Sequence, residues 1–329
     1  MTRRILITGG TGFIGAGAVR RLVAKGHEVR VFDNNSRGAL RRLADMGGEY
    51  EMVEGDIRDA AAVQRAAAGC TQVLHLAYVN GTEFFYSQPE LVLDVGVRGM
   101  LNVLDACRAC GIRDLILASS SEVYQTPGRV PTDERVPLVV PDPLNPRYSY
   151  GGGKIICELM ALNYGRTQFD RVVIFRPHNV YGPDMGWEHV LPQFALRMAN
   201  LHAETAAGSP LRFAIQGDGS ETRAFNYIED FLDGLELVIE RGEHLGIYHI
   251  GSREEVAIAD VARRVGQWFE RDVQIQAGPL QAGGTPRRCP DIGKLAALGY
   301  SPRVPLTEGL PSLINWYVAN SHLAPARKN

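Results

Sequence analysis

Short apolar runs alternate with longer segments of helical periodicity through the first half of the chain. The runs are rich in Val, Ile and Leu and predict β-strands at residues 5–8, 28–32, 50–53, 72–76, 114–118 and 172–175. Strands that alternate with helices form right-handed βαβ units, whose strands are parallel and whose helices cover both faces of the sheet. The first half is therefore expected to be a doubly wound α/β domain.

Beyond Pro177 this alternation lapses, and Pro, Gly and Trp become frequent. A helix is expected near residues 228–240 and a strand at 247–250 that rejoins the sheet, followed by short helices and strands. We therefore predict one domain from residues 1–176 and 226–252, and a smaller, discontinuous α/β lobe from residues 177–225 and 253–329.

Two of the predicted helices, at about residues 91–110 and 150–168, are apolar over more than one face. The sheet can bury only one face of a helix that lies on it. The sequence therefore predicts that a second subunit covers the outer surface of these helices.

The composition limits the kinds of partner and compartment. Lys and Arg number 35 against 37 Asp and Glu, so the formal charge of −2 gives no broad field that attracts nucleic acid or an anionic membrane. The apolar run at residues 5–7 is too short for a secretory signal, and no stretch approaches the roughly 18 apolar residues of a membrane-spanning helix. We expect a cytoplasmic protein with neither nucleic-acid nor membrane partners.

The five cysteines are an odd set scattered along the chain, which is typical of reduced thiols rather than of a disulfide framework. Cys107 and Cys110 form a C-x-x-C pair, but no second Cys or His pair follows at zinc-site spacing. No metal site is therefore expected.

Glycines follow the first predicted strand and open the helix behind it. The turn contains Gly9, Gly12 and Gly15, and the helix begins near Phe13 and Ile14. The glycines allow close approach of the backbone, and the helix N-terminus offers unpaired N–H groups to a pyrophosphate. Strand, turn and helix together predict a Rossmann-type dinucleotide site.

Asp33 ends the second predicted strand, where a carboxylate accepts hydrogen bonds from the ribose 2′-hydroxyl of NAD and repels the 2′-phosphate of NADP. NAD is therefore the expected cofactor, although Arg37 would neutralise a 2′-phosphate if its loop folded back. The alternative is that Asp33 only forms a turn before Asn34. After the third strand, Asp56 is placed to reach the adenine ring and Ile57 to pack on it.

Tyr150 and Lys154 lie four residues apart at the start of a predicted helix, so both project from one face. A cation beside a phenol favours the phenolate and lowers a pKa that is about 10 in the unperturbed side chain. Tyr150 is therefore a candidate general base.

A serine-rich segment follows the fifth predicted strand, at the edge where doubly wound sheets bind ligands. It contains Ser119, Ser120, Ser121 and Glu122. The hydroxyls would hydrogen-bond a substrate oxygen, and the alternative is a turn that only caps the strand.

Taken together, these residues resemble the extended short-chain dehydrogenase/reductase family, and within it the nucleotide-sugar epimerase and dehydratase branch of the UDP-galactose 4-epimerase type. The matching segments span nearly the whole chain: residues 8–15, 33–34, 55–57, 75–77 and 119–124, Tyr150 with Lys154, and residues 176–183, 217–223 and 290–292.

The resemblance implies roles for the matching residues. Tyr150 would be the base, Lys154 would hold the nicotinamide ribose and tune Tyr150, and Ser120 would be the hydroxyl partner. The NAD site would comprise Gly9, Gly12, Phe13, Ile14, Gly15, Asp33, Asn34, Asp56, Ile57, Leu76, Ala77, Ser119, Tyr150 and Lys154.

For the substrate, the resemblance implies a nucleotide-diphosphate sugar. Asn179 and Arg223 would bind it, with Arg223 at the diphosphate and Arg288 as a second candidate there. It also implies a homodimer in which the helices containing Met100 and Cys157 form a four-helix interface.

Two positions depart from the family pattern. Gly153 stands where members often have Ser or Thr before the Lys, and Gln125 where they often have Gly. Neither change removes a proton-transfer group, and both are expected to alter the shape of the substrate site.

The implied chemistry begins when Tyr150 takes the proton of the sugar 4-hydroxyl as hydride leaves C4 for NAD, giving a 4-ketose. Return of the hydride to the opposite face makes the enzyme a 4-epimerase, which is the first prediction and favours an isomerase over a lyase. Glu122 opens a second route, a dehydratase of the 4,6 or 5,6 type.

Two further alternatives remain. The pair Ser121-Glu122 is shared with UDP-glucuronate decarboxylases, but residues 184–187 supply no Arg for a sugar carboxylate. A non-catalytic NAD(P)-binding scaffold or sensor is the last alternative, although such proteins usually lack the Tyr and Lys pair that this chain has.

Overall fold

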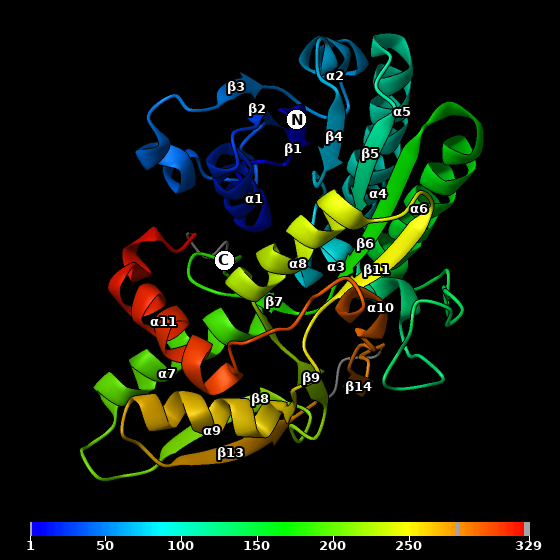
Figure 1. The fold of residues 1–329 in the computed structure, drawn as a ribbon. Coiled ribbons are helices and arrows are strands. Elements are labelled where there is room, and N and C mark those ends of the chain that lie inside the picture. Colours follow the sequence, from blue (N-terminus) through cyan, green and yellow to red (C-terminus); the bar gives the residue numbers. More distant parts are fainter. Residues whose placement is uncertain (1, 280–282, 326–329) are drawn as a thin grey trace.

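A seven-stranded parallel sheet forms the centre of the computed structural model, which describes residues 2–279 and 283–325 (Figure 1). Its spatial order is β11 (Gly246–Ile250), β6 (Arg171–Pro177), β5 (Asp114–Ala118), β4 (Gln72–His75), β1 (Arg4–Thr8), β2 (Glu28–Asp33) and β3 (Glu51–Glu54). Every neighbouring pair is parallel. The predicted doubly wound Rossmann-type sheet is confirmed, and the strand at 247–250 joins its edge.

Alternate residues of each strand enter two different cores. In β1, Ile5 and Ile7 face one layer and Leu6 faces the other, because side chains alternate across an extended strand. One core lies under α1 (Phe13–Ala24), α8 (Ile228–Arg241) and α10 (Gly293–Ala296), and the other under α2 (Ala60–Ala67), α5 (Gly99–Cys110) and α6 (Ser149–Gln168). Burial of each large aliphatic side chain contributes about 1.5–3 kcal/mol.

The helix expected at residues 91–110 is built from three consecutive pieces. These are α4 (Pro89–Leu93), a π-helical turn (Asp94–Arg98) and α5. A π-turn widens the helix by one residue and often lies beside a functional site. The helix α3 (Thr82–Ser87) precedes α4, and short 3₁₀ turns lie at Leu40–Met46, Ser121–Tyr124, Pro146–Tyr148 and Ser321–Leu323.

A third core lies below the sheet in the view of Figure 1. It is enclosed by α7 (Val190–Glu204), β8 (Leu211–Gln216), α9 (Ile258–Trp268), β13 (Val273–Gly278) and α11 (Leu306–Ala319). Strand β9 (Thr222–Ala224) pairs with β12 (Glu255–Ala257) and β14 (Arg287–Arg288), and β7 (Val180–Tyr181) pairs with β10 (Asn226–Tyr227). The limits of the two lobes remain a prediction, and residues 1, 280–282 and 326–329 of those ranges lie outside the described residues.

Within the described part of the chain, no helix is both long and apolar enough to cross a membrane. All five cysteines are free thiols. A search of the same residues for three or more His, Cys, Asp or Glu side chains able to hold one metal ion finds none.

Candidate active site

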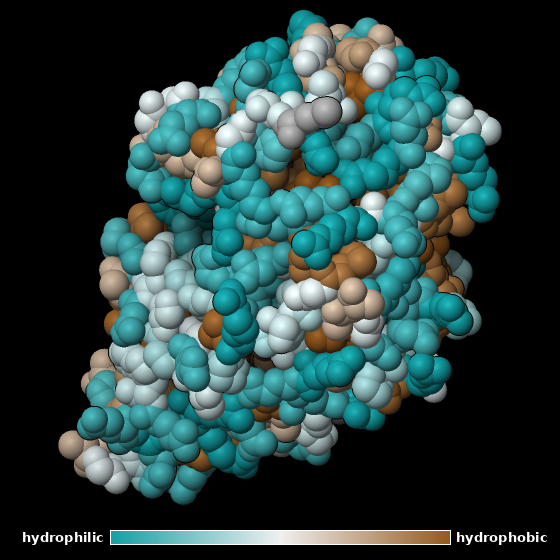
Figure 2. Space-filling model, viewed as in Figure 1, coloured by the Kyte–Doolittle hydropathy of each residue, from teal (hydrophilic) through white to brown (hydrophobic). Residues whose placement is uncertain are grey.

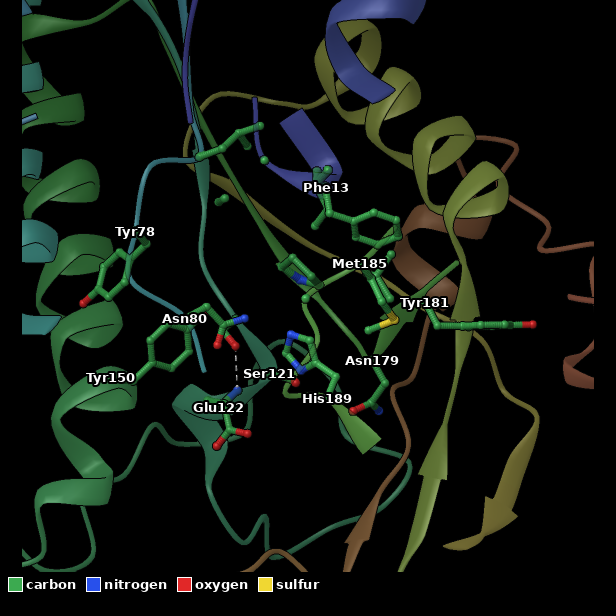
Figure 3. Close-up of a pocket in the computed structure, with 18 of the residues that line it drawn as sticks. Phe13, Tyr78, Asn80, Ser121, Glu122, Tyr150, Asn179, Tyr181, Met185 and His189 are labelled. Carbon is green, nitrogen blue, oxygen red and sulfur yellow. Dashed lines mark hydrogen bonds between the residues drawn. The ribbon is translucent and has the colours of Figure 1, made fainter. Parts of the chain in front are cut away.

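A cavity of about 400 Å³ opens at the carboxyl edge of the sheet, where β1, β4 and β5 end. Tyr78 and Tyr150 lie on one side of it, and Phe13, Met185 and His189 lie on the other (Figure 3). Most of the predicted site residues line it: Gly9, Gly12, Phe13, Ile14, Gly15, Leu76, Ser119, Ser120, Ser121, Glu122, Tyr150, Lys154, Asn179 and Arg288. The sheet therefore gathers segments that are far apart in the sequence.

The glycine turn forms one end of the cavity. A Cβ atom on Gly15 would lie 2.1 Å from the Gly9 carbonyl oxygen, so no larger residue fits there. Helix α1 begins at Phe13 behind Gly12, and no side chain caps its N-terminus. The free N–H groups of this first turn are a suitable cradle for a pyrophosphate. The residues present thus fit a dinucleotide.

Asp33 organises this turn. Its two carboxylate oxygens accept hydrogen bonds from the backbone N–H groups of Thr11 at 3.0 Å and Asn35 at 2.9 Å. Arg37 lines the cavity, but its guanidinium is engaged there, 4.4 Å from the centre of the Phe84 ring and 3.4 Å from a Glu188 oxygen. Asp33 is not among the residues that line the cavity.

The remaining predicted NAD-site residues, Asn34, Asp56, Ile57 and Ala77, also lie outside the lining. Asp56 is hydrogen-bonded to Arg58 and Asn34, and the Arg58 guanidinium lowers the pKa of that carboxyl to about 2. Ile57 is buried in the core beside Gly99. The Ala77 N–H donates to the Thr8 hydroxyl.

Tyr150 is enclosed by aromatic rings. The Phe85 ring is stacked on it at 4.7 Å, and the Tyr78 ring contacts it edge-on at 5.1 Å. Burial raises the pKa of the Tyr150 phenol above its usual value, and a hydrogen bond with Ser120 offsets only part of this. The lowering of this pKa that the sequence predicts does not outweigh the effect of burial.

Lys154 points to the same region but contacts other groups. Its ammonium donates to the Ala118 carbonyl at 2.8 Å and lies 3.9 Å from the centre of the Tyr78 ring, against 5.9 Å for Tyr150. Burial lowers the pKa of Lys154 to about 8. Lys154 is therefore closer to losing its proton at neutral pH than an ordinary lysine. Of the two rings, that of Tyr78 is the nearer to its ammonium.

Glu122 forms the floor of the cavity together with Arg288. The Arg288 guanidinium donates to the Glu122 carboxylate at 2.7 Å and to the Thr285 hydroxyl at 3.0 Å. Burial raises the pKa of Glu122, but Arg288 and Arg147 together lower it by more, so the net pKa is lowered. Glu122 is therefore an ionised carboxylate.

Arg223 lies directly behind this pair. Strands β9 and β14 are parallel with Arg223 opposite Arg288, so the two side chains leave the small sheet on the same side. Burial, followed by the charge of Arg288, lowers the pKa of Arg223 to about 10. Arg223 does not line the cavity itself, but two adjacent guanidiniums are a strong anion site.

Asn179 lines the cavity in a left-handed backbone conformation, with φ of 40°. Its side-chain amide donates to the Ala224 carbonyl at 3.0 Å. The amide therefore joins β9 to the carboxyl end of β6.

Sequence reasoning missed several lining residues. Tyr78, Asn80, Thr82 and Phe85 follow β4, and their position after a central strand was the signal that would have found them. The segment after β7 also contributes Met185, Gly186, His189, Val190 and Leu191 to the lining.

The chain is similar to known proteins both in sequence and in structure. Residues 5–251 match the model of the NAD dependent epimerase/dehydratase family. UDP-glucuronic acid decarboxylase 1 of Arabidopsis thaliana is 30% identical over 315 residues, which are 95% of this chain and 69% of that protein.

Two solved structures show the same arrangement over the whole chain. A dTDP-glucose 4,6-dehydratase of Streptomyces venezuelae with NAD bound is 29% identical, with a TM-score of 0.84 over 97% of this chain and 98% of the other. The Thermus thermophilus UDP-glucose 4-epimerase in complex with NAD is 28% identical, with a TM-score of 0.82 over 96% and 99%.

Proposed function

Because the chain belongs to the NAD-dependent epimerase/dehydratase family, we propose that it is a nucleotide-sugar 4-epimerase that oxidises the sugar at C4 and then returns the hydride to the opposite face. The sequence prediction of NAD as cofactor is confirmed by the family and by NAD-bound structural relatives. We further propose that the enzyme is a cytoplasmic homodimer.

The glycine turn, with the N–H groups of Phe13, Ile14 and Gly15, would hold the pyrophosphate of NAD, and Lys154 would hold the nicotinamide ribose. Bound NAD⁺ supplies the hydride acceptor and a positive charge that favours the phenolate of a nearby tyrosine. That charge would counter the effect of burial on the pKa of Tyr150.

Tyr150 is the base in this proposal. Its phenolate removes the proton of the sugar 4-hydroxyl, while the Ser120 hydroxyl donates a hydrogen bond to the same oxygen. When the ketone is reduced again, Tyr150 returns the proton. The Tyr150 ring packs against the rings of Phe85 and Tyr78, and these contacts hold the phenol in one orientation.

One observation carries the choice of epimerisation: the Glu122 carboxylate is tied to Arg288 and its pKa is lowered. Expelling water from the sugar needs a group that can donate a proton. Ser121 stands where 4,6-dehydratases usually carry an acid, and an ionised Glu122 cannot replace it. Oxidation and reduction through Tyr150 need neither residue.

Arg223 and Arg288 would bind the diphosphate of the substrate. They are adjacent in register, and Arg288 lines the cavity, in a chain whose formal charge is only −2. Two guanidiniums match a dianion in charge and hydrogen-bond geometry. Asn179 would contact the sugar-nucleotide between them and the glycine turn.

A second candidate is decarboxylation of a nucleotide-linked glucuronate. The Arabidopsis relative is named for that reaction, and the Ser121-Glu122 pair is shared with such enzymes. Residues 184–187 supply no arginine to bind a sugar carboxylate. Arg288 of β14 lines the cavity and would supply that positive charge instead. Against this candidate, a sugar carboxylate beside Arg288 would also lie beside the Glu122 carboxylate and be repelled by it.

The experiment is to incubate the enzyme and NAD with UDP-, dTDP-, GDP- and CDP-linked hexoses and with UDP-glucuronate, and to follow the sugar by NMR. The proposal expects interconversion of C4 epimers with no loss of carbon or water. Release of carbon dioxide from UDP-glucuronate alone would establish the second candidate and overturn the first.

A further inference from the structure

Tyr78 fills a slot that two glycines leave open. A Cβ atom on Gly153 would lie 2.2 Å from the Tyr78 phenol oxygen, and one on Gly96 would lie 2.3 Å from the carbon that bears it. Gly153 is the position in α6 that departs from the family pattern, and Gly96 lies in the π-helical turn Asp94–Arg98. The wide turn, the two glycines and the tyrosine ring therefore belong to one packing arrangement.

The Tyr78 ring contacts both members of the proposed catalytic pair. The Lys154 nitrogen lies 3.9 Å from the ring centre, within the range of a cation–π interaction, and the Tyr150 ring meets it edge-on with an interplanar angle of 84°. Tyr78 reaches them from the loop after β4, whereas both partners belong to α6.

We propose that Tyr78 is a positioning residue whose ring face holds the Lys154 ammonium in its charged form and whose perpendicular packing against Tyr150 fixes the ring of Tyr150. This inference rests on the roles proposed above for Tyr150 and Lys154. Gly153 and Gly96 then leave the space that the Tyr78 side chain occupies. A serine or threonine before Lys154 would collide with that side chain, which explains the glycine at position 153.

The aromatic ring of Tyr78, rather than its hydroxyl, makes the contacts with Lys154 and Tyr150. The Tyr78 phenol oxygen is buried without a hydrogen-bond partner among the described residues. In Figure 3 this oxygen points away from Asn80 and Glu122, out of the cavity. A buried hydroxyl without a partner costs free energy, so phenylalanine is expected to serve in its place.

The charge of Lys154 depends on few neighbours. The titratable groups that face it are Tyr78, Tyr150, His75, Cys157 and Glu158. Burial keeps His75 neutral, with a pKa of about 3, and raises the pKa of the Cys157 thiol to about 11. Glu158 is already paired with Arg176. The Tyr78 ring can thus be altered without changing the formal charge around Lys154.

The first test is the titration of Lys154 itself. The chain has four lysines, Lys25, Lys154, Lys294 and Lys328. Protein labelled with ¹³C at the lysine ε-carbon will therefore give four resolvable NMR signals, and Lys154→Arg identifies the one from Lys154. Tyr78→Leu is expected to lower the pKa of Lys154 by about one unit because the cation–π contact is lost. Tyr78→Phe keeps the ring and is expected to keep the wild-type value.

The second test is a packing cycle between Tyr78 and Gly153. Gly153→Ser is expected to lower the melting temperature, because its Cβ would collide with the phenol oxygen. In Tyr78→Phe the nearest ring atom is 3.6 Å from that Cβ, an ordinary contact. The double variant Tyr78→Phe/Gly153→Ser is therefore expected to recover stability relative to Gly153→Ser alone.

Both tests can fail independently of the proposed function, since neither needs a substrate. An unchanged or raised pKa of Lys154 in Tyr78→Leu overturns the positioning role, and so does equal damage by Gly153→Ser in both backgrounds. If both tests succeed but no nucleotide sugar is converted, the proposed function fails while the packing role of Tyr78 stands.

Discussion

At the scale of single residues, the enclosure of Tyr150 decides what its substitution will do. Tyr150→Phe removes only the phenol oxygen and leaves the stacking on Phe85 intact. NAD binding is expected to persist, while turnover falls by about 10²-fold or more because the proton-transfer group is gone. Dinucleotide titration and NMR of the sugar product measure the two effects.

Tyr164→Phe, on the same helix but in the core away from the cavity, is the matched control for Tyr150→Phe. It is expected to retain activity. Full turnover by Tyr150→Phe would remove Tyr150 from the mechanism.

Asp33 offers a second test at this scale. Its carboxylate accepts hydrogen bonds from the backbone N–H of Thr11, in the glycine turn, and from the backbone N–H of Asn35. Asp33→Asn replaces one acceptor by a donor and is expected to weaken NAD binding about tenfold or more. Calorimetry measures this, with Asp105→Asn on the exposed side of α5 as control. Unchanged affinity would show that the turn does not depend on this carboxylate.

Buried histidines predict acid sensitivity. Burial lowers the pKa of His75 to about 3 and of His249 to about 4, whereas an unfolded histidine titrates near 6.5. Between these values the unfolded chain binds protons that the folded chain does not. The free energy of unfolding should therefore fall as pH drops below about 6.5, by up to about 1.4 kcal/mol per pH unit for each histidine.

Urea unfolding at pH 7 and pH 5 measures this loss. His75→Asn keeps a polar group near Thr8 and is expected to reduce the difference between the two pH values, whereas His202→Asn on exposed α7 surface leaves it unchanged. The idea fails if His75→Asn shows the wild-type difference.

The site residues that the sequence predicted share one property: each follows from local position. Gly15 and Tyr150 belong to a strand–turn–helix pattern or a helical spacing, and Glu122 follows a central strand. Tyr78 also follows a central strand, but its contacts with α6 and the π-turn leave no signal in the sequence. The pairing of Arg288 with Glu122 likewise appears only when residues 166 positions apart are brought together.

At the scale of elements, α6 is fixed to the sheet by a buried ion pair. Arg176 on β6 donates to Glu158 on α6 through Nε at 2.8 Å and a terminal nitrogen at 2.6 Å, and both side chains are 2% exposed. The Ser119 hydroxyl donates to the same carboxylate. This pair holds the helix of Tyr150 and Lys154 against the end of β5.

Glu158→Gln is expected to lower the free energy of unfolding by about 3–5 kcal/mol, because the Arg176 charge would be left buried without a counterion. Asp170→Asn breaks the exposed pair with Arg113 and should cost at most about 1 kcal/mol. Urea unfolding compares the two. Equal small losses would contradict the structural role given to the buried pair.

Elements were predictable where a periodic pattern was long. Strands β1 and β5 and helix α6 were found with nearly correct ends. Helix α7 was missed, although Leu191, Phe194, Ala195 and Met198 bury one of its faces, because Pro192 and the surrounding Gly and Trp suggested irregular structure. Strands of two or three residues, such as β14, are too short to show any period.

At the scale of the molecule, the outer surface of α5 and α6 is the expected dimer interface. Leu101, Ile156 and Leu159 are exposed there. The face in Figure 2 is mostly hydrophilic, with apolar surface along the edge where Figure 1 places α6. Exposed apolar side chains on neighbouring helices are typical of a subunit contact.

Light scattering is expected to show a dimer, and Leu159→Arg to yield a monomer with the same helix content. Leu40→Arg adds the same charge at an exposed leucine that belongs to neither α5 nor α6. It is expected to leave the dimer intact. A wild-type protein that is monomeric at micromolar concentration would refute this interface.

The pairing of β9 with β14 has a consequence for synthesis of the protein. The ion pair on the floor of the cavity joins Arg288 of β14 to Glu122, so it can form only after almost the entire chain has left the ribosome. The glycine turn, Ser120 and Tyr150 all precede β14 in the chain, whereas Arg288 does not. A translation product that stops short of Arg287 would therefore lack Arg288 and leave the Glu122 carboxylate without this ion pair.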